Sequence, residues 1–201
     1  MNSAGTAGST PWQGRAKERQ RRILSTGLRW EGTAKDLFRQ IRKHLLDASA
    51  SEHIKTPPHE ILRLIKLTPK TDEEIAITGG EKDFGRTFQR PHFKRADGAG
   101  FDFVITLREK KGGTIELLAY DYELRFPPAA IEASTDTRLL PTSLRFDLNL
   151  PGHDNEHDAL RCHLHPGADD ILVPAPLLGP LEMLDLFLYE IAPRDPERRR
   201  A

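Results

Sequence analysis

The feature that most constrains the fold is a stretch of alternating apolar and polar side chains between Phe101 and Phe126. Phe101–Leu107 alternates aromatic or aliphatic residues with polar ones, Lys111-Gly112-Gly113 supplies a turn, and the pattern resumes over Thr114–Phe126. Period-two alternation is typical of strands, and a glycine pair between two such runs reverses the chain. The sequence therefore predicts an antiparallel β-hairpin here.

Further segments with a β pattern lie on both sides of the hairpin. Ser143–Asn149 alternates leucine and phenylalanine with charged or amide residues, and Ala159–His165 returns as another strand after a polar loop. One more short strand is predicted around Glu74–Thr78. Short connections between these segments favour an antiparallel sheet of about four to five strands.

Three helices complete the predicted fold. The first begins after Thr33, a good N-cap, and carries apolar residues on one face of a 3.6-residue period. The second opens at the Pro57-Pro58 pair and runs to Ile65, and the third opens at Pro180 with leucines at three- and four-residue spacing. Two N-terminal helices, an antiparallel sheet and a C-terminal helix packed on it make an α+β fold.

The length of 201 residues is typical of one domain with tails. We expect a disordered basic tail over residues 1–25, a single α+β domain over residues 26–192 and a basic C-terminal tail over residues 193–201. The net charge is zero, so no global field attracts nucleic acid or anionic membranes, and any such contact must come from a local patch.

The cysteine content and hydropathy bear on the compartment. The single Cys162 excludes an internal disulfide and any multi-cysteine zinc site, which fits a reducing environment. No stretch approaches 18 apolar residues, and Met1–Gly14 has no apolar core of a secretory signal. The sequence predicts a cytoplasmic protein without a membrane partner.

The most chemically loaded part of the chain holds four of its eight histidines within thirteen positions, from 153 to 165. His163 and His165 share one face of a predicted strand, a spacing that presents two nitrogens to one metal ion. His153 and His157 lie in the loop before it. The four histidines, with Asp154 or Glu156 from that loop, form a candidate site for zinc, manganese or iron.

The same strands also allow a metal-free reaction. His163 or His165 can act as general base towards a ribose 2′-hydroxyl, with the other histidine as acid and Arg161 or Arg145 holding a phosphate. Asp147 shares this polar face, which we expect to be exposed. The opposite face supplies the core through Leu144, Phe146, Leu148, Leu160, Cys162 and Leu164.

A family resemblance rests on the order of several short motifs. Tyr120-Asp121-Tyr122 is followed by Leu144-Arg145-Phe146-Asp147, a loop that bears histidines, His163-x-His165 and a terminal helix rich in leucine and glutamate. Over residues 101–191 this order resembles the small TumE-like toxins of bacterial toxin–antitoxin modules. The chain departs from them in its N-terminal helices and in the insertion after Phe126. The resemblance implies a growth-affecting or RNA-directed role with a cognate protein partner.

Three hypotheses follow from these patterns. The first is a toxin-like or defence-associated protein that acts on or binds RNA through the polar sheet face. The second is a non-enzymatic subunit that docks a protein partner through its tails and terminal helix. The third is a divalent-metal-binding domain.

Overall fold

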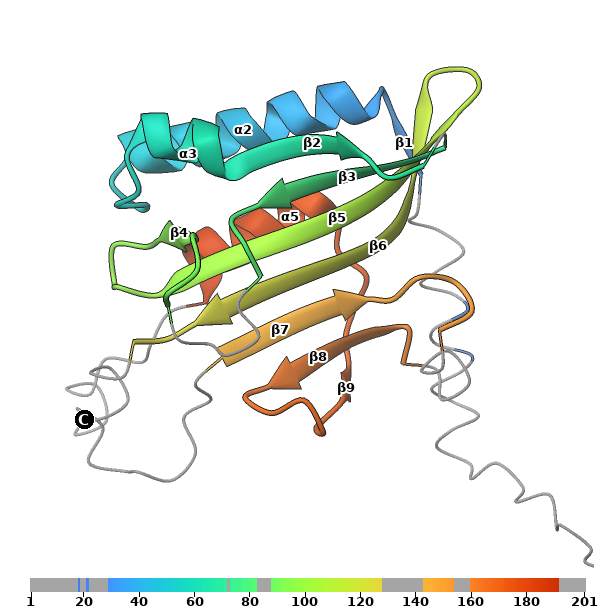
Figure 1. Ribbon diagram of the computed structural model, residues 1–201. Helices are drawn as coiled ribbons and strands as arrows, with labels where there is room; N and C mark the ends of the chain where they lie inside the picture. Colours follow the sequence, from blue (N-terminus) through green and yellow to red (C-terminus); the bar gives the residue numbers. More distant parts are fainter. Residues whose placement is uncertain are drawn as a thin grey trace, which may run out of the picture.

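The computed structural model describes Glu18, Arg21 and residues 29–71, 73–82, 88–127, 143–153 and 160–191. In these residues the chain forms one antiparallel sheet, with α2 (Ala34–Ala50) and α5 (Pro180–Asp185) behind it in Figure 1. The predicted α+β class is therefore confirmed.

The sheet is larger than predicted, with nine strands among the described residues instead of four or five. Its main path is β2-β3-β5-β6-β7-β8-β9, while β1 pairs with β6 and β4 with β5, all antiparallel. The strands are β1 (Arg29–Glu31), β2 (Ile65–Pro69), β3 (Glu74–Gly79), β4 (Phe93–Lys94), β5 (Gly100–Lys110), β6 (Thr114–Arg125), β7 (Ser143–Leu148), β8 (Cys162–Pro166) and β9 (Val173–Pro174).

The strands missing from the prediction, β1, β2, β4 and β9, have two to five residues each. Segments this short show too few alternations to be recognised from their own side chains. They are held instead by backbone pairing with longer neighbours, β2 with β3 and β9 with β8, for example. These strands form only through tertiary pairing, and the local sequence pattern does not report on that pairing.

The predicted hairpin is confirmed as β5 and β6. Gly112 and Gly113 in its turn have φ values of 100° and 76°, which favour glycine. The register shifts between Thr106 and Leu107, so that Thr106 pairs with Ala119 and Leu107 with Leu117. Leu118 is therefore the extra residue of a β-bulge.

The helices begin at the predicted signals, but the second and third end differently. Thr33 caps α2 with a capping box, in which the Asp36 backbone N–H donates to the Thr33 hydroxyl at 3.2 Å. The helix α3 (Pro58–Leu64) is shorter than predicted, because Ile65 already pairs with Gly79 as the first residue of β2. The last helix continues from α5 into a π-helical turn, η2 (Leu186–Glu190).

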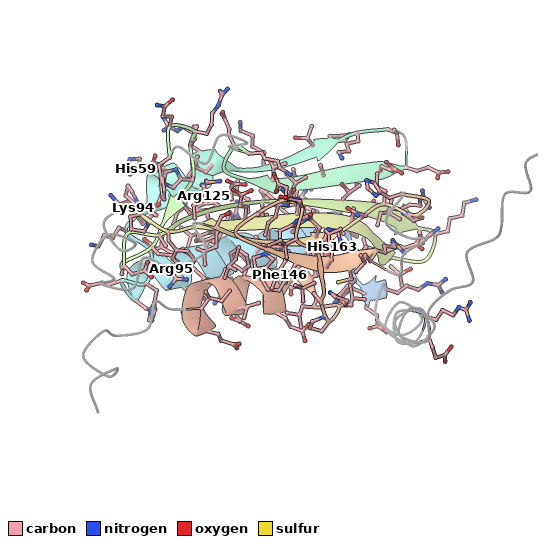
Figure 2. All side chains as sticks on the ribbon, turned by 90° about the horizontal axis from the view of Figure 1, so that it is seen from below. His59, Lys94, Arg95, Arg125, Phe146 and His163 are labelled. Carbon is pink, nitrogen blue, oxygen red and sulfur yellow. The ribbon has the colours of Figure 1, made fainter. Side chains whose placement is uncertain are left out.

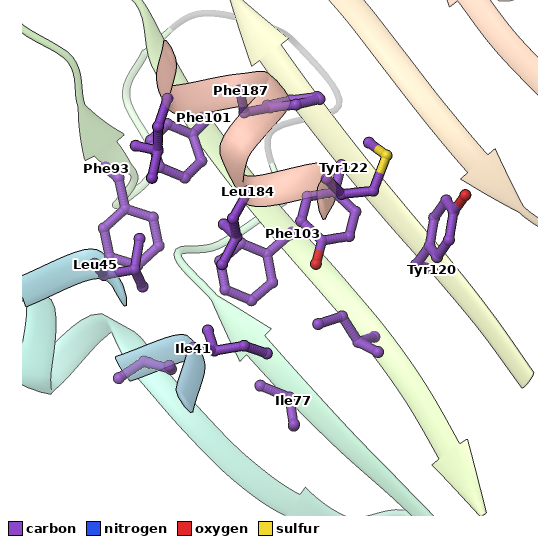
Figure 3. Close-up of a cluster of buried hydrophobic side chains, with 14 of the residues drawn as sticks. Ile41, Leu45, Ile77, Phe93, Phe101, Phe103, Tyr120, Tyr122, Leu184 and Phe187 are labelled. Atoms are coloured by element: carbon purple, nitrogen blue, oxygen red, sulfur yellow. The ribbon is translucent and has the colours of Figure 1, made fainter. Parts of the chain in front are cut away.

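An aromatic cluster joins the helices to the sheet. Figure 3 shows Leu45 of α2 and Phe187 of η2 on the side of the sheet that carries Phe103 and Tyr122. The Phe187 ring lies 5.7 Å from the Tyr122 ring, and the Tyr122 hydroxyl donates to the backbone carbonyl of Pro180 at 3.0 Å. This cluster holds the C-terminal segment against the centre of the sheet.

The predicted tails, residues 1–25 and 193–201, lie outside the described residues apart from Glu18 and Arg21, which are helical and exposed. The expected boundaries of the domain stay predictions. None of the described helices has the length and apolar composition required to cross a membrane.

Replacing Phe187 tests the role of the aromatic cluster. Phe187→Ala removes a fully buried ring that contacts Phe101, Tyr122 and Phe146, so it should lower the free energy of unfolding by about 3–5 kcal/mol. Leu62→Ala on the exposed face of α3 is the control and should change it by less than about 0.5 kcal/mol. Urea denaturation measures both, and equal effects would show that this cluster does not anchor η2.

Candidate functional site

The face of the sheet that points away from the helices carries a continuous set of polar side chains. Residues paired across neighbouring strands share a face, and the register places Asp121 opposite Asp147, and Asp147 opposite His163. Arg145 pairs with His165 in the next row on that face. Figure 2 shows the two faces, with Phe146 towards the helices and Arg125 on the other side. The predicted alternation of β7 and β8 is thus confirmed.

Three of the predicted site residues converge on one point. His163 Nε2 lies 3.0 Å from His165 Nε2 and 3.3 Å from Asp147 Oδ2, and His165 Nε2 lies 3.1 Å from the same oxygen. Among the described residues these three form the group whose donor atoms could hold a metal ion. We call this group the triad.

The triad is buried, which corrects the expectation of an exposed face. Asp147 is 7% exposed, His165 5% and His163 1%. The two imidazole rings pack edge to face with centroids 4.7 Å apart, and the Asp147 carboxylate lies beside them. The three side chains therefore shield one another from solvent.

The hydrogen bonds define the role of one nitrogen in each ring. His163 Nδ1 is 2.5 Å from the Leu160 carbonyl oxygen, which only accepts, so this nitrogen carries a hydrogen. His165 Nε2 is 2.7 Å from Arg145 Nη2, which only donates, so His165 Nε2 is an acceptor. His163 Nε2, His165 Nε2 and Asp147 Oδ2 thus lie within 3.0–3.3 Å of one another. Three such atoms this close together require a proton or another cation between or beside them.

Arg145 supplies a positive charge next to the triad. Its Nε donates to Asp147 Oδ2 at 3.0 Å, and its Nη1 donates to Asp169 Oδ1 at 2.8 Å. Burial raises the pKa of Asp147, but the contacts with His163 and His165 and the charge of Arg145 outweigh it and hold the pKa well below its usual range. Asp147 is therefore an ionised carboxylate.

Arg161, the fifth predicted residue, has backbone partners. Its Nη2 donates to the Leu118 carbonyl at 2.9 Å, and its Nε donates to the Asn149 carbonyl at 2.8 Å. Leu118 is the bulged residue of β6. It lies between the part of β6 that pairs with β1 and the part that pairs with β7. The guanidinium thus satisfies a carbonyl that the sheet leaves without a ladder partner.

His153, the one loop histidine that the structure describes, does not join the triad. His153 is exposed, and its Nδ1 lies 3.3 Å from Asn149 Nδ2. His157, with the candidate loop ligands Asp154 and Glu156, lies outside the described residues. On the other face, Cys162 is buried as predicted, and its thiol donates to the Pro176 carbonyl at 3.3 Å.

The sequence singled out Asp147 as a catalytic residue but not as a metal ligand. The signal that could have assigned this role is the strand register, because pairing Leu148 with Cys162 places Asp147 opposite His163. Alternation alone gives the face of each side chain, and the register was not predicted.

A pocket of about 560 Å³ adjoins the triad. Lys82, from the segment after β3, lies in its wall and forms an ion pair with Asp121. Burial lowers the pKa of Lys82, while the charge of Asp147 opposes this effect. The pocket is lined by Lys82, Val104, Thr106, Ala119, Tyr120, Asp121, Arg145, Asp147, Leu148, Asn149, Leu150 and His153.

Sequence reasoning missed a second buried charged cluster on this face. Arg125 is fully buried, and its Nη1 lies 2.5 Å from Asp102 Oδ2 and 3.6 Å from Glu123 Oε1. The Phe88 ring centre lies 5.9 Å from the guanidinium carbon. Burial raises the pKa of Asp102 to about 6, although Arg125 opposes the shift. This cluster of one guanidinium and two carboxylates lies beside the candidate site, since Glu123 pairs with Arg145 across β6 and β7.

Comparison of the chain with protein families, with curated proteins and with solved structures finds no match. The TumE-like resemblance therefore stays a prediction, and the functional argument rests on the geometry of the site.

The structural role of Arg161 can be tested by removing its donors. Arg161→Met keeps an apolar stem but leaves the Leu118 and Asn149 carbonyls without these hydrogen bonds. The free energy of unfolding should therefore fall by about 1–3 kcal/mol. The control is Arg39→Met, which removes an exposed ion pair with Asp36 on α2 and should have an effect below about 1 kcal/mol. Both are measured by chemical denaturation. A fully stable Arg161→Met protein would contradict the role assigned to this side chain.

Proposed function

We propose that this protein binds a divalent transition-metal ion through Asp147, His163 and His165, with zinc as the first candidate. The observation that carries the proposal is the convergence of two imidazole Nε2 atoms and one carboxylate oxygen within 3.0–3.3 Å of one another. Two histidines and one carboxylate are a ligand set that suits zinc, and also iron(II).

The spacing of the donor atoms fits such an ion. Zinc bonds of about 2.0–2.1 Å place two ligands about 3.3 Å apart in tetrahedral geometry and about 2.9 Å apart at adjacent octahedral positions. The distances in the triad fall within this interval. The ion can therefore be accommodated with small movements of the three ligands.

The surroundings of the triad support the same proposal. A metal-binding histidine commonly donates its other ring N–H to a carbonyl or carboxylate, which orients the ring. The Leu160 carbonyl does this for His163. The strand backbones of β7 and β8 hold Asp147 and His163 opposite each other, so two ligands lie on paired regular strands rather than on a loop.

Three protein ligands leave at least one coordination position for water or a substrate. Asp147 lies in the wall of the adjoining pocket, so that side gives access to the ion. A metal ion there would supply Lewis acidity and lower the pKa of a bound water. The RNA-directed hypothesis stays a prediction, and it needs the ribose to reach two rings that are almost completely buried.

The direct experiment measures metal content and affinity. Purified protein should bind about one equivalent of zinc by elemental analysis, in accordance with one site for one ion. Asp147→Asn and His165→Ala should each weaken zinc binding about 10-fold to 100-fold or more, as measured with a competing chelator dye. Zinc at 100 times its Kd should raise the free energy of unfolding of the wild type by about 2.7 kcal/mol.

The matched control is His59→Ala, because this histidine is exposed on α3, away from the triad. It should bind zinc as the wild type does. If the wild type binds no zinc, iron(II), cobalt(II) or manganese, or if the triad variants retain full affinity, the proposed function is wrong.

A further inference from the structure

Arg145 contacts the same lone pairs that a metal ion would use. Its Nη2 lies 2.7 Å from His165 Nε2, and its Nε donates to Asp147 Oδ2 at 3.0 Å. A metal ion about 2.0–2.1 Å from these two atoms takes up the directions in which the guanidinium now donates. Two cations at this distance also repel each other strongly in a buried site. Metal binding and the present position of Arg145 are therefore mutually exclusive.

We infer, on the basis of the proposed metal site, that binding of the ion is coupled through Arg145 to binding of a small oxyanion in the adjoining pocket. The ion displaces the guanidinium from His165 and Asp147, and the displaced guanidinium holds a carboxylate or phosphate group against the ion. The oxyanion is the chemical class of ligand or substrate for this site.

The structure provides a path for this movement. Arg145 Nη1 is already 2.8 Å from Asp169 Oδ1, and the Asp169 side chain is largely exposed. Asp169 can therefore keep its contact while the rest of the guanidinium leaves the triad. Arg145 also lines the pocket, so the released N–H groups have space next to the coordination position that the ion leaves open.

The charges around the pocket favour an anion once the ion is bound. Lys82 and Arg145 are balanced by Asp121 and Asp147 in the structure. A divalent ion adds two positive charges next to Asp147 in a poorly solvated place. A bound oxyanion restores part of the balance, and a guanidinium binds carboxylate or phosphate through two parallel hydrogen bonds.

The shape of the pocket limits the size of the ligand. A volume of about 560 Å³ lies within the usual range for small-molecule sites. Val104 and Ala119 are apolar residues of its lining. The pocket thus fits a small organic acid or a phosphate ester.

The test compares cobalt(II) affinity with and without two probes, acetate and methyl phosphate, using the visible absorption of the bound ion. In the wild type at least one probe should tighten cobalt(II) binding about 5-fold to 150-fold, the usual range for coupled sites. Because the coupling is reciprocal, cobalt(II) should tighten binding of that probe by the same factor. A larger effect of acetate identifies a carboxylate ligand, and a larger effect of methyl phosphate identifies a phosphate ligand.

Arg145→Gln separates this coupling from metal binding itself. Without a probe it should bind cobalt(II) more tightly than the wild type, because the internal competitor is gone, and the enhancement by the probe should fall several-fold. The matched control is Arg108→Gln, an arginine of β5 that pairs with Glu74 and Glu116 and does not line the pocket. It should behave as the wild type in both measurements.

The outcomes distinguish this inference from the function on which it rests. Stoichiometric cobalt(II) binding without an effect of either probe, or an unchanged probe effect in Arg145→Gln, overturns the coupling and leaves the metal site intact. Weaker cobalt(II) binding by Arg145→Gln without a probe also overturns it, because Arg145 would then support the ion rather than compete with it. Failure of the wild type to bind any metal ends both proposals.

Discussion

The backbone pairing of β7 with β8 is the interaction on which the candidate site depends. It pairs Asp147 with His163 and Arg145 with His165, and because paired residues share a face, all four side chains point away from the helices. The same pairing puts Phe146 opposite Leu164 on the other face, where Phe146 contacts Phe187. One register thus determines both the core contact and the triad.

This arrangement has an energetic consequence. Ionisable groups buried on a sheet face destabilise the fold unless each has a partner. Most of the charge on this face is compensated within the sheet, by Arg125 near Asp102, by Lys82 at Asp121 and by Arg145 at Asp147. The triad is different, since it brings two imidazole nitrogens and a carboxylate together, and the Arg145 guanidinium contacts them from one side. A metal ion between the three atoms would stabilise such a group, which is why we propose metal binding for it.

The sequence predicted the parts of the fold that have local patterns. The alternation over residues 101–126 predicted the hairpin, and Thr33 predicted the start of α2. Strands such as β4 and β9 were missed, because two residues carry no periodicity and form only by pairing with a neighbour. Alternation likewise predicted that His163, His165 and Asp147 share a face. It did not predict the burial of the triad or the backbone contacts of Arg161, because these depend on strand register and on the bulge at Leu118. These features arise from the assembled sheet and have no signal in a single segment.

The measurement that tests the central claim most directly is nitrogen NMR of the histidine rings in 15N-labelled protein, before and after addition of zinc. The structure predicts that His163 Nδ1 carries a hydrogen, and that on addition of zinc the Nε2 resonances of His163 and His165 shift, whereas that of the exposed His59 does not. An Nε2-protonated form of either ring, with no change in its resonance when zinc is added, would contradict a metal site at the triad.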